Sequence, residues 1–144
     1  MRKLIWLILS AAFPLLADTS ATNHYDILKD STWFAISGGF ANAMTPEGQA
    51  MSAILKQTNA AATFQKLLHE KAPAPQLYGL LGLHLLNAPE FKTTLPRLLD
   101  RKTKVRVLMG CIVGEQEVGT VARQIQANQW NIRDVPAPQP KQDL

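Results

Sequence analysis

The chain has 144 residues, of which 47% are hydrophobic and 18% are charged. This length suffices for one domain with its own core, and the composition is typical of a globular protein rather than of a disordered one. The formal net charge is +4, and without Arg2 and Lys3 it falls to +2, since 13 basic residues then face 11 acidic ones. So small a surplus does not by itself indicate binding to nucleic acid or to a membrane surface.

The N-terminus has the layout of a secretory signal peptide, which we assign to residues 1–17. Arg2 and Lys3 form a short basic region, and an uncharged apolar run follows at residues 4–16 (LIWLILSAAFPLL). Cleavage after Ala17, or alternatively after Ala21, would leave a mature protein in a periplasm or outside the cell. We therefore expect no stable membrane anchor once the segment is removed.

The beginning of the mature chain divides into a lead-in and a first helix. Residues 18–30 are polar and mixed, and they predict a lead-in with one short turn. A helical domain is then predicted over residues 31–130. Its first helix would start at Ser31 or Thr32 as a cap and extend to Met44. Gly38-Gly39 is costly inside a helix, so this pair indicates close approach of another backbone or a break.

Two helical hairpins follow. Thr45-Pro46-Glu47 has the form of a helix start, with a capping hydroxyl, a proline and an acid in the first turn. Four helices are predicted near residues 45–57, 60–71, 75–86 and 90–101, and Asn87 and Glu90 form a potential capping box before the last of them. Pro96 predicts a kink or a break within it. The uncharged apolar helix at 75–86 is expected to be the buried centre of the domain.

The two hairpins resemble each other. An offset of 27 residues aligns Pro46 with Pro73 and Phe64 with Phe91, among other matches. Over residues 45–101 this resembles helical-hairpin repeats of the HEAT or armadillo kind. The predicted fold class is therefore mainly α, either as a small irregular helical bundle or as a two-hairpin HEAT-like array.

The chain changes character after residue 101. Alternation of Val105 and Val107 with Lys104 and Arg106 predicts one short extended segment near residues 103–112 that lies on the helices. An amphipathic helix is predicted over residues 115–128, and it would bury the residues Val118, Val121, Ala122 and Ile125. Trp130 is expected to close over the core, and residues 131–144 are expected to be a disordered, proline-rich tail.

Candidate chemical groups are few. His84 shares the apolar side of its predicted helix and is interpreted as a partly buried histidine held by one hydrogen bond. Cys111 is the only cysteine, so an internal disulfide and zinc sites built on several cysteines are excluded. The apolar neighbours of Cys111 favour an inert, buried thiol. No histidine is followed at helical spacing by another ligand, so we predict no catalytic, metal or cofactor-binding residues.

The densest charge cluster is the predicted site of partner binding. It is a basic patch that comprises Arg97, Arg101, Lys102, Lys104 and Arg106. Nucleic acid is discounted as its partner, because export would separate the two and no aromatic residues interleave the patch.

The stretches Gly38-Gly39, Gln76-Leu-Tyr-Gly-Leu and Gly110-Cys-Ile-Val113 resemble small secreted bacterial proteins of unknown function. This resemblance implies no particular activity. The leading hypothesis is an exported, non-enzymatic helical protein that binds another protein as an inhibitor, immunity protein or accessory subunit. The alternatives are a carrier of a small apolar ligand or lipid, with His84 as its polar group, and a thiol hydrolase that uses Cys111.

Overall fold

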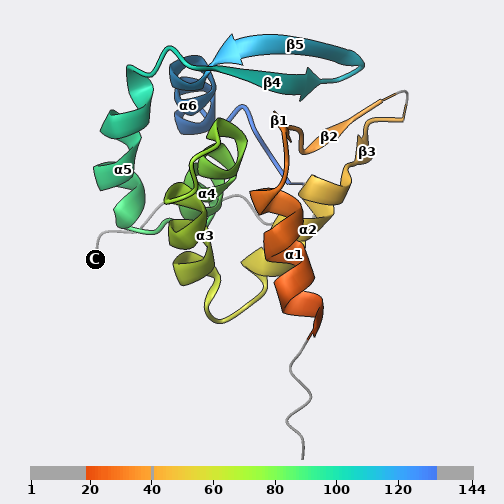
Figure 1. The fold of residues 1–144 in the computed structure, drawn as a ribbon, viewed down its shortest axis with the longest axis vertical. Helices are drawn as coiled ribbons and strands as arrows, with labels where there is room; N and C mark the ends of the chain where they lie inside the picture. Colours follow the sequence, from red (N-terminus) through yellow and green to blue (C-terminus); the bar gives the residue numbers. More distant parts are fainter. Residues whose placement is uncertain (1–18, 40, 133–144) are drawn as a thin grey trace, which may run out of the picture.

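A computed structural model describes residues 19–39 and 41–132 (Figure 1). The predicted signal peptide and residues 133–144 of the predicted tail lie outside these ranges. The described chain is mainly helical, but two small sheets make it more than a pure helical bundle. Its helices are α1 (Thr19–Lys29), α2 (Pro46–Leu55), α3 (Ala60–Leu68), α4 (Pro73–Leu85), α5 (Glu90–Leu99) and α6 (Val118–Gln126). Its strands are β1 (Trp33–Phe34), β2 (Ser37–Gly38), β3 (Ala43–Met44), β4 (Lys104–Met109) and β5 (Ile112–Glu117).

Helix α4 is the buried centre of the fold, as its uncharged sequence predicted. It contacts α3, α5 and α6, and it also reaches α1 and β1 (Figure 1). Leu77, Leu80 and Leu81 are completely inaccessible to solvent. A helix that is apolar on every side is stable in water only when other elements surround it.

Two glycines allow α3 to lie close against α4. A Cβ atom on Gly79 would stand 2.6 Å from the carbonyl oxygen of Phe64, and one on Gly82 would stand 2.3 Å from the Phe64 ring. No side chain larger than hydrogen fits at these distances. Helix α3 therefore packs closely on this face of α4, and its buried Phe64 side chain is the group that meets the two glycines.

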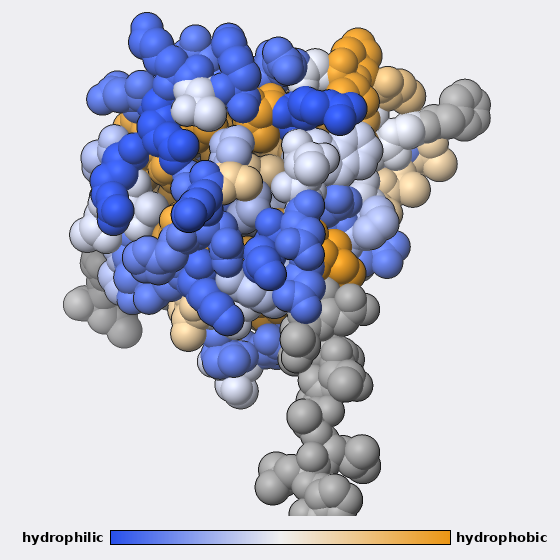
Figure 2. Space-filling view, viewed as in Figure 1, coloured by the Kyte–Doolittle hydropathy of each residue, from blue (hydrophilic) through white to orange (hydrophobic). Residues whose placement is uncertain are grey.

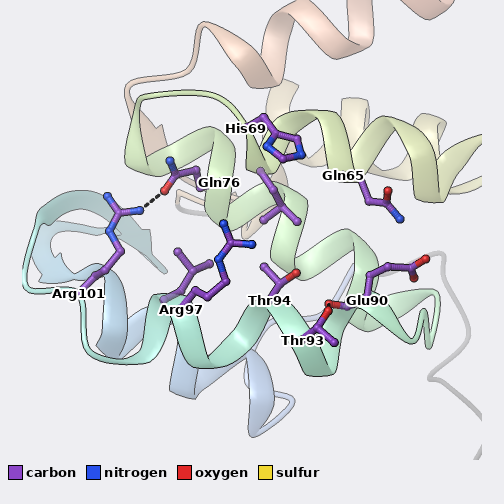
Figure 3. Close-up of a pocket in the computed structure, with 10 residues that line it drawn as sticks. Gln65, His69, Gln76, Glu90, Thr93, Thr94, Arg97 and Arg101 are labelled. Carbon is purple, nitrogen blue, oxygen red and sulfur yellow. Dashed lines mark hydrogen bonds between the residues drawn. The ribbon is translucent and has the colours of Figure 1, made fainter.

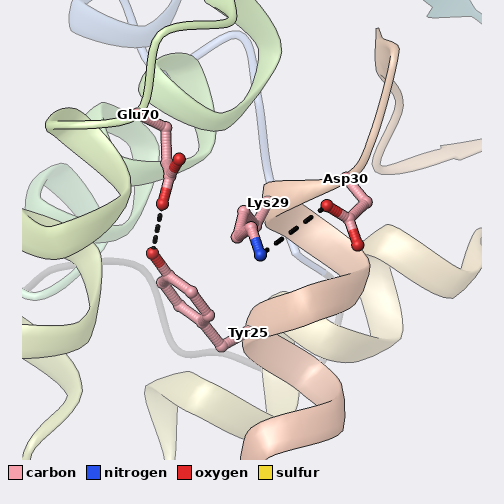
Figure 4. A network of polar contacts seen from close by, with 4 residues as sticks. All are labelled: Tyr25, Lys29, Asp30 and Glu70. Carbon is pink, nitrogen blue, oxygen red and sulfur yellow. Dashed lines mark hydrogen bonds and ion pairs between the residues drawn. The ribbon is translucent and has the colours of Figure 1, made fainter.

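The segment predicted as a polar lead-in forms helix α1. Leu28 is fully buried, and the Tyr25 hydroxyl donates a hydrogen bond of 2.6 Å to Glu70 Oε1 (Figure 4). The Lys66 ammonium lies 4.5 Å from the centre of the Tyr25 ring. Tyr25 and Leu28 are three residues apart, which places them on one side of a helix, and together with the partly buried Ile27 they attach α1 to the domain.

The prediction of a helix over residues 31–44 is wrong. This segment contains three short strands, and Gly39 and Asn42 adopt positive φ angles of 77° and 46° between β2 and β3. A backbone with two left-handed residues turns back on itself rather than continuing as a helix. Gly38 makes the expected close approach, because a Cβ there would lie 2.7 Å from the Gly110 carbonyl oxygen.

Tyr78 connects the central helix to β1. Its hydroxyl donates a hydrogen bond of 2.8 Å to the Trp33 carbonyl and accepts one of 2.9 Å from the Ala35 amide. Its ring centre lies 4.9 Å from that of Phe34, which in turn meets Trp130 at 4.7 Å. Trp130 is 8% exposed, so it closes the core as predicted.

The starts of α2 and α5 compare differently with prediction. Thr45 caps α2 as expected, since its Oγ1 accepts a hydrogen bond of 3.0 Å from the Gly48 amide. The prediction of a capping box before α5 is wrong. Asn87 has a φ of 52° and follows the end of α4, which is a position that asparagine tolerates better than most residues. Helix α5 instead begins after Pro89, without a side-chain cap, and it continues without a break through Pro96.

The single extended segment predicted near residues 103–112 is one half of a hairpin. Strand β5 pairs antiparallel with β4, from Lys104 opposite Glu117 to Met109 opposite Ile112. The φ of 60° at Gly110 suits the two-residue turn that joins them. Strand β4 also pairs in parallel with β1, which gives the sheet order β1-β4-β5.

Because β5 extends to Glu117, helix α6 starts at Val118 rather than at residue 115. The four residues predicted to be buried by this helix are buried: Val118, Val121, Ala122 and Ile125. Ile132 is also buried, at 3% exposure, so the packed domain extends slightly into the predicted tail.

Candidate functional site

The five residues of the predicted basic patch occupy two different settings. Arg97 and Arg101 line one groove, and Lys102 is exposed on the connection that follows. Lys104 and Arg106 lie on β4, where β5 supplies acids opposite them. The Lys104 Nζ atom is 3.6 Å from Glu117 Oε1, and Arg106 is in register with Glu115. Lys104 is thus paired with an acid, whereas the other four cations of the patch form no ion pair within the described residues.

The groove lies between α5 and the α3–α4 pair (Figure 3). Its volume is about 280 Å³, and most of its lining side chains are polar. Gln76 holds one of the two guanidiniums in place, because its Oε1 accepts a hydrogen bond from Arg101 Nη1. The Nε2 atom of Gln76 donates in turn to the Glu70 carbonyl at 2.6 Å, which fixes the orientation of the amide. We call this cavity the α5 groove.

The turn of the β4–β5 hairpin exposes apolar side chains. Exposed fractions are 49% for Met109, 73% for Ile112 and 47% for Val113, and these are the large hydrophobic residues that stand out as exposed in the described chain. Figure 2 shows orange and tan atoms at the upper edge of a mainly blue surface, over the β4–β5 hairpin. We call residues 109–113 the hairpin tip.

The hairpin tip is apolar on both of its faces. Met109 lies directly opposite Ile112 in the register, and Leu108 lies directly opposite Val113. Successive residues of a strand point to opposite faces, so one pair covers each side of the hairpin. Val105 and Val107 of the same strand are buried against the helices, whereas Met109 lies beyond the part of the core that could cover it.

Strand β5 also forms an edge of its sheet. The strand order β1-β4-β5 leaves it with one described neighbour. In an antiparallel pair, alternate residues direct their N–H and C=O groups away from the partner strand. The outer edge of β5 therefore offers backbone donors and acceptors next to the apolar side chains of the hairpin tip.

Cys111 is exposed, which corrects the prediction of a buried thiol. The prediction rested on the apolar neighbours of Cys111. Gly110 begins a turn immediately before this residue, so the Cys111 side chain lies on a loop instead of on the core face of a strand.

His84 has the structural role that its position predicted. It is partly buried, its Nε2 lies 2.7 Å from Asn128 Oδ1, and its ring centre is 4.7 Å from that of Phe91. These contacts join α4 to α5 and to the residues after α6. Within the described residues, no group of three or more histidine, cysteine, aspartate and glutamate side chains is placed to hold a metal ion.

Two further findings bear on function. None of the helices in the described part of the chain combines the length and the apolar character that crossing a membrane requires. The sequence matches no protein-family model, and it is not significantly similar to any curated protein. The function of each candidate site must therefore be inferred from its geometry.

Sequence reasoning missed the hairpin tip. The available signal was Gly110, a glycine at the end of an alternating apolar run, followed after one residue by two β-branched residues, Ile112 and Val113. A glycine with strand-forming residues on both sides is a hairpin signal. The acids and glutamine of residues 115–117 were instead interpreted as the first turn of a helix.

Proposed function

We propose that this chain is an exported, non-enzymatic binding protein that acts by contact with another protein. Inhibitors, immunity proteins and accessory subunits act in this way. The observation that carries the proposal is the hairpin tip, where Met109, Ile112 and Val113 are exposed side by side. Clustered apolar side chains on the surface of a small domain are characteristic of interaction sites. The basic and apolar N-terminal segment supports export.

The surroundings of the hairpin tip suit a protein interface. Interfaces combine a hydrophobic centre with a polar rim. Here the exposed side chains of the hairpin tip would form the centre, and Arg106 and Glu115, which lie opposite each other in the register, would be at the rim. A partner strand could add to the free edge of β5, which would supply main-chain hydrogen bonds beside the apolar contacts.

The helical body would then serve as a rigid support. A two-hairpin origin of this body remains part of the proposal, and it is supported by the positions of Pro46 and Pro73, which are the first residues of α2 and α4. Phe64 and Phe91, which the 27-residue offset also aligns, lie in α3 and α5.

Cys111 permits a direct test, because it is the sole cysteine and lies within the proposed interface. A photoactivatable cross-linker attached to this thiol should capture a stoichiometric partner from an envelope extract. The variant Ile112→Ser/Val113→Ser should lose the cross-linked product, because it removes the apolar contact. Ala127→Ser, at an exposed position after α6, is the control and should keep it.

Equal capture by both variants would contradict the proposal, and so would the absence of any cross-linked protein. A co-purifying lipid found by mass spectrometry would favour the alternative, a carrier of small apolar ligands. A specific observation supports that alternative, namely a cavity of about 320 Å³ beneath the hairpin that is lined in part by Leu108, Met109 and Trp130.

A further inference from the structure

We propose that the α5 groove is a second binding site, and that its ligand is an oxyanion, either a carboxylate or a phosphate group. This inference goes beyond the proposed function, since the α5 groove and the hairpin tip share no residue. The site would hold the anion between the guanidiniums of Arg97 and Arg101.

Both arginines are available to a ligand. Neither guanidinium forms an ion pair with a carboxylate of the described residues, whose ion pairs join Lys29 to Asp30 and Lys104 to Glu117. Arg101 uses one of its N–H groups on Gln76, and Arg97 has no hydrogen-bond partner within the described chain. A guanidinium carries five N–H donors in a planar fork that matches the geometry of carboxylate and phosphate.

The two guanidiniums act from one side of the groove. Arg97 lies in the last turn of α5 and Arg101 lies two residues after its end, and both line the cavity. The bond from Gln76 fixes Arg101 before any ligand arrives, which lowers the entropy lost on binding. In Figure 3 the Arg97 guanidinium points into the space between α5 and the α3–α4 pair.

Other hydrogen-bond donors share the groove with the arginines. The Thr94 hydroxyl, the Gln65 amide and the exposed imidazole of His69 line the same cavity. The Thr93 hydroxyl donates a hydrogen bond of 2.9 Å to the Glu90 carbonyl, so it is already engaged. A ligand with three or four oxygen atoms could therefore meet hydroxyl and amide donors as well as the two cations.

Two sources of negative charge near the groove would repel an anion, and the effect of each is smaller than the attraction by the two arginines. Glu90 lies seven residues before Arg97 on α5, which separates the two by roughly 10 Å along the helix axis at 1.5 Å per residue. Figure 3 shows the Glu90 carboxylate at the other end of the groove. The carboxyl end of α5 carries an effective charge of only about half a unit, against two full charges on the guanidiniums.

The test uses the whole mature protein, labelled with ¹⁵N and titrated separately with inorganic phosphate and with citrate at constant ionic strength. Saturable amide shifts confined to α5 and to the α3–α4 connection are expected. Arg97→Gln and Arg101→Gln should each weaken the binding at least about fivefold, since each removes one of two charged donors. Lys102→Gln is the matched control, because it removes the same charge from an exposed neighbour that does not line the groove.

A fourth variant tests the sign of the electrostatic effect. Glu90→Gln should leave the affinity unchanged or raise it, since it removes the opposing charge. Saturation by phosphate alone, by citrate alone or by both would support the site and would identify which oxyanion it accepts. Linear shifts spread over the basic surface would overturn it, and so would equal weakening by Lys102→Gln. Ile112→Ser/Val113→Ser should bind both probes normally, which separates this test from that of the hairpin tip.

Discussion

Helix α4 and the hairpin tip are both apolar and both contain glycine, yet one is enclosed and the other is exposed. Leu77, Leu80 and Leu81 of α4 are inaccessible to solvent, whereas Ile112 of the tip is 73% exposed. The difference lies in what each glycine permits. Gly79 and Gly82 let α3 cover the helix, whereas Gly110 turns the chain back before any element can cover the tip. Apolar sequence therefore holds the fold together in one region and stays exposed to solvent in the other.

The largest expected effect tests this contrast with one side-chain truncation in each region. Leu81→Ala should lower the free energy of unfolding by about 2–5 kcal/mol, because it leaves a cavity in the centre of the core. Ile112→Ala should change it by less than about 0.5 kcal/mol, since surface substitutions usually do. Urea titration followed by circular dichroism measures both values. Similar losses from the two variants would show that the hairpin tip is packed in solution.

The next effect concerns the glycines themselves. Gly79→Ala should destabilise the protein by about 1–3 kcal/mol despite the better helix propensity of alanine, because the new Cβ would meet the Phe64 carbonyl. Gly114→Ala in β5 is the matched control, since a Cβ at that position has no neighbour within 4 Å. A stability gain from Gly79→Ala, measured by the same titration, would rule out close contact between α3 and α4.

Removal of the Tyr78 hydroxyl should cost about 1–3 kcal/mol, because Tyr78→Phe leaves the buried Ala35 amide without its acceptor and removes one of the two hydroxyl donors to the Trp33 carbonyl. Thermal unfolding of the variant measures the loss. Tyr25→Phe, on the partly exposed α1, is the comparison and should cost less. Equal losses would mean that burial of Tyr78 does not increase the contribution of its hydrogen bonds to the free energy of unfolding.

Stability should also decline at alkaline pH. Partial burial, together with the hydrogen bond to the Glu70 carboxylate and its charge, raises the pKa of Tyr25 from 10.0 to about 12. The unfolded chain thus releases this proton at lower pH than the native chain does. The contribution of Tyr25 is therefore complete below pH 10 and is lost as the pH rises towards 12.

Burial also raises the pKa of Tyr78, so this residue adds a decline of the same sign. Unfolding titrations between pH 9 and 12 should therefore give a shallower decline for Tyr25→Phe than for the unaltered protein. An identical decline in the two proteins would exclude a role for the Tyr25–Glu70 contact.

The smallest expected effect is chemical rather than energetic. Cys111 should react with iodoacetamide in the native protein, without denaturant, because it lies exposed on the turn. The reaction is followed by mass spectrometry, and the denatured chain provides the reference rate. A thiol that stays unmodified until denaturant is added would mean that the hairpin tip is covered in solution.

The sequence predicted the helices better than the strands, because helices depend on residues close together in the sequence and strand pairing depends on residues far apart. The start of α2 follows from Thr45 and Pro46 alone, and the burial of α6 follows from residues within nine positions. These are local patterns. Strand β1 has only two residues, and its partner β4 is distant in the sequence, at residues 104–109. No local pattern could therefore reveal their pairing.

The candidate sites were predicted only in part. The cluster of Arg97 and Arg101 is visible in the sequence, and the structure gives these two residues a common groove. The pairing of Lys104 with Glu117 was not predictable, because it required β5 to be recognised as a strand. The exposure of the hairpin tip depends on where the core ends, and this is a property of the assembled helices rather than of residues 109–113.

The parallel pairing of Trp33 with Arg106 has a consequence for the order of folding. Strand β1 lies near the start of the described chain, and it gains its neighbour only when residues 104–109 have been synthesised. Contacts between such distant residues form slowly, because the intervening chain must first be closed into a loop. Helices α1 to α5 precede β4 in the chain and can therefore associate before β1 pairs with it, whereas the sheet that presents the hairpin tip and helix α6 complete the domain later.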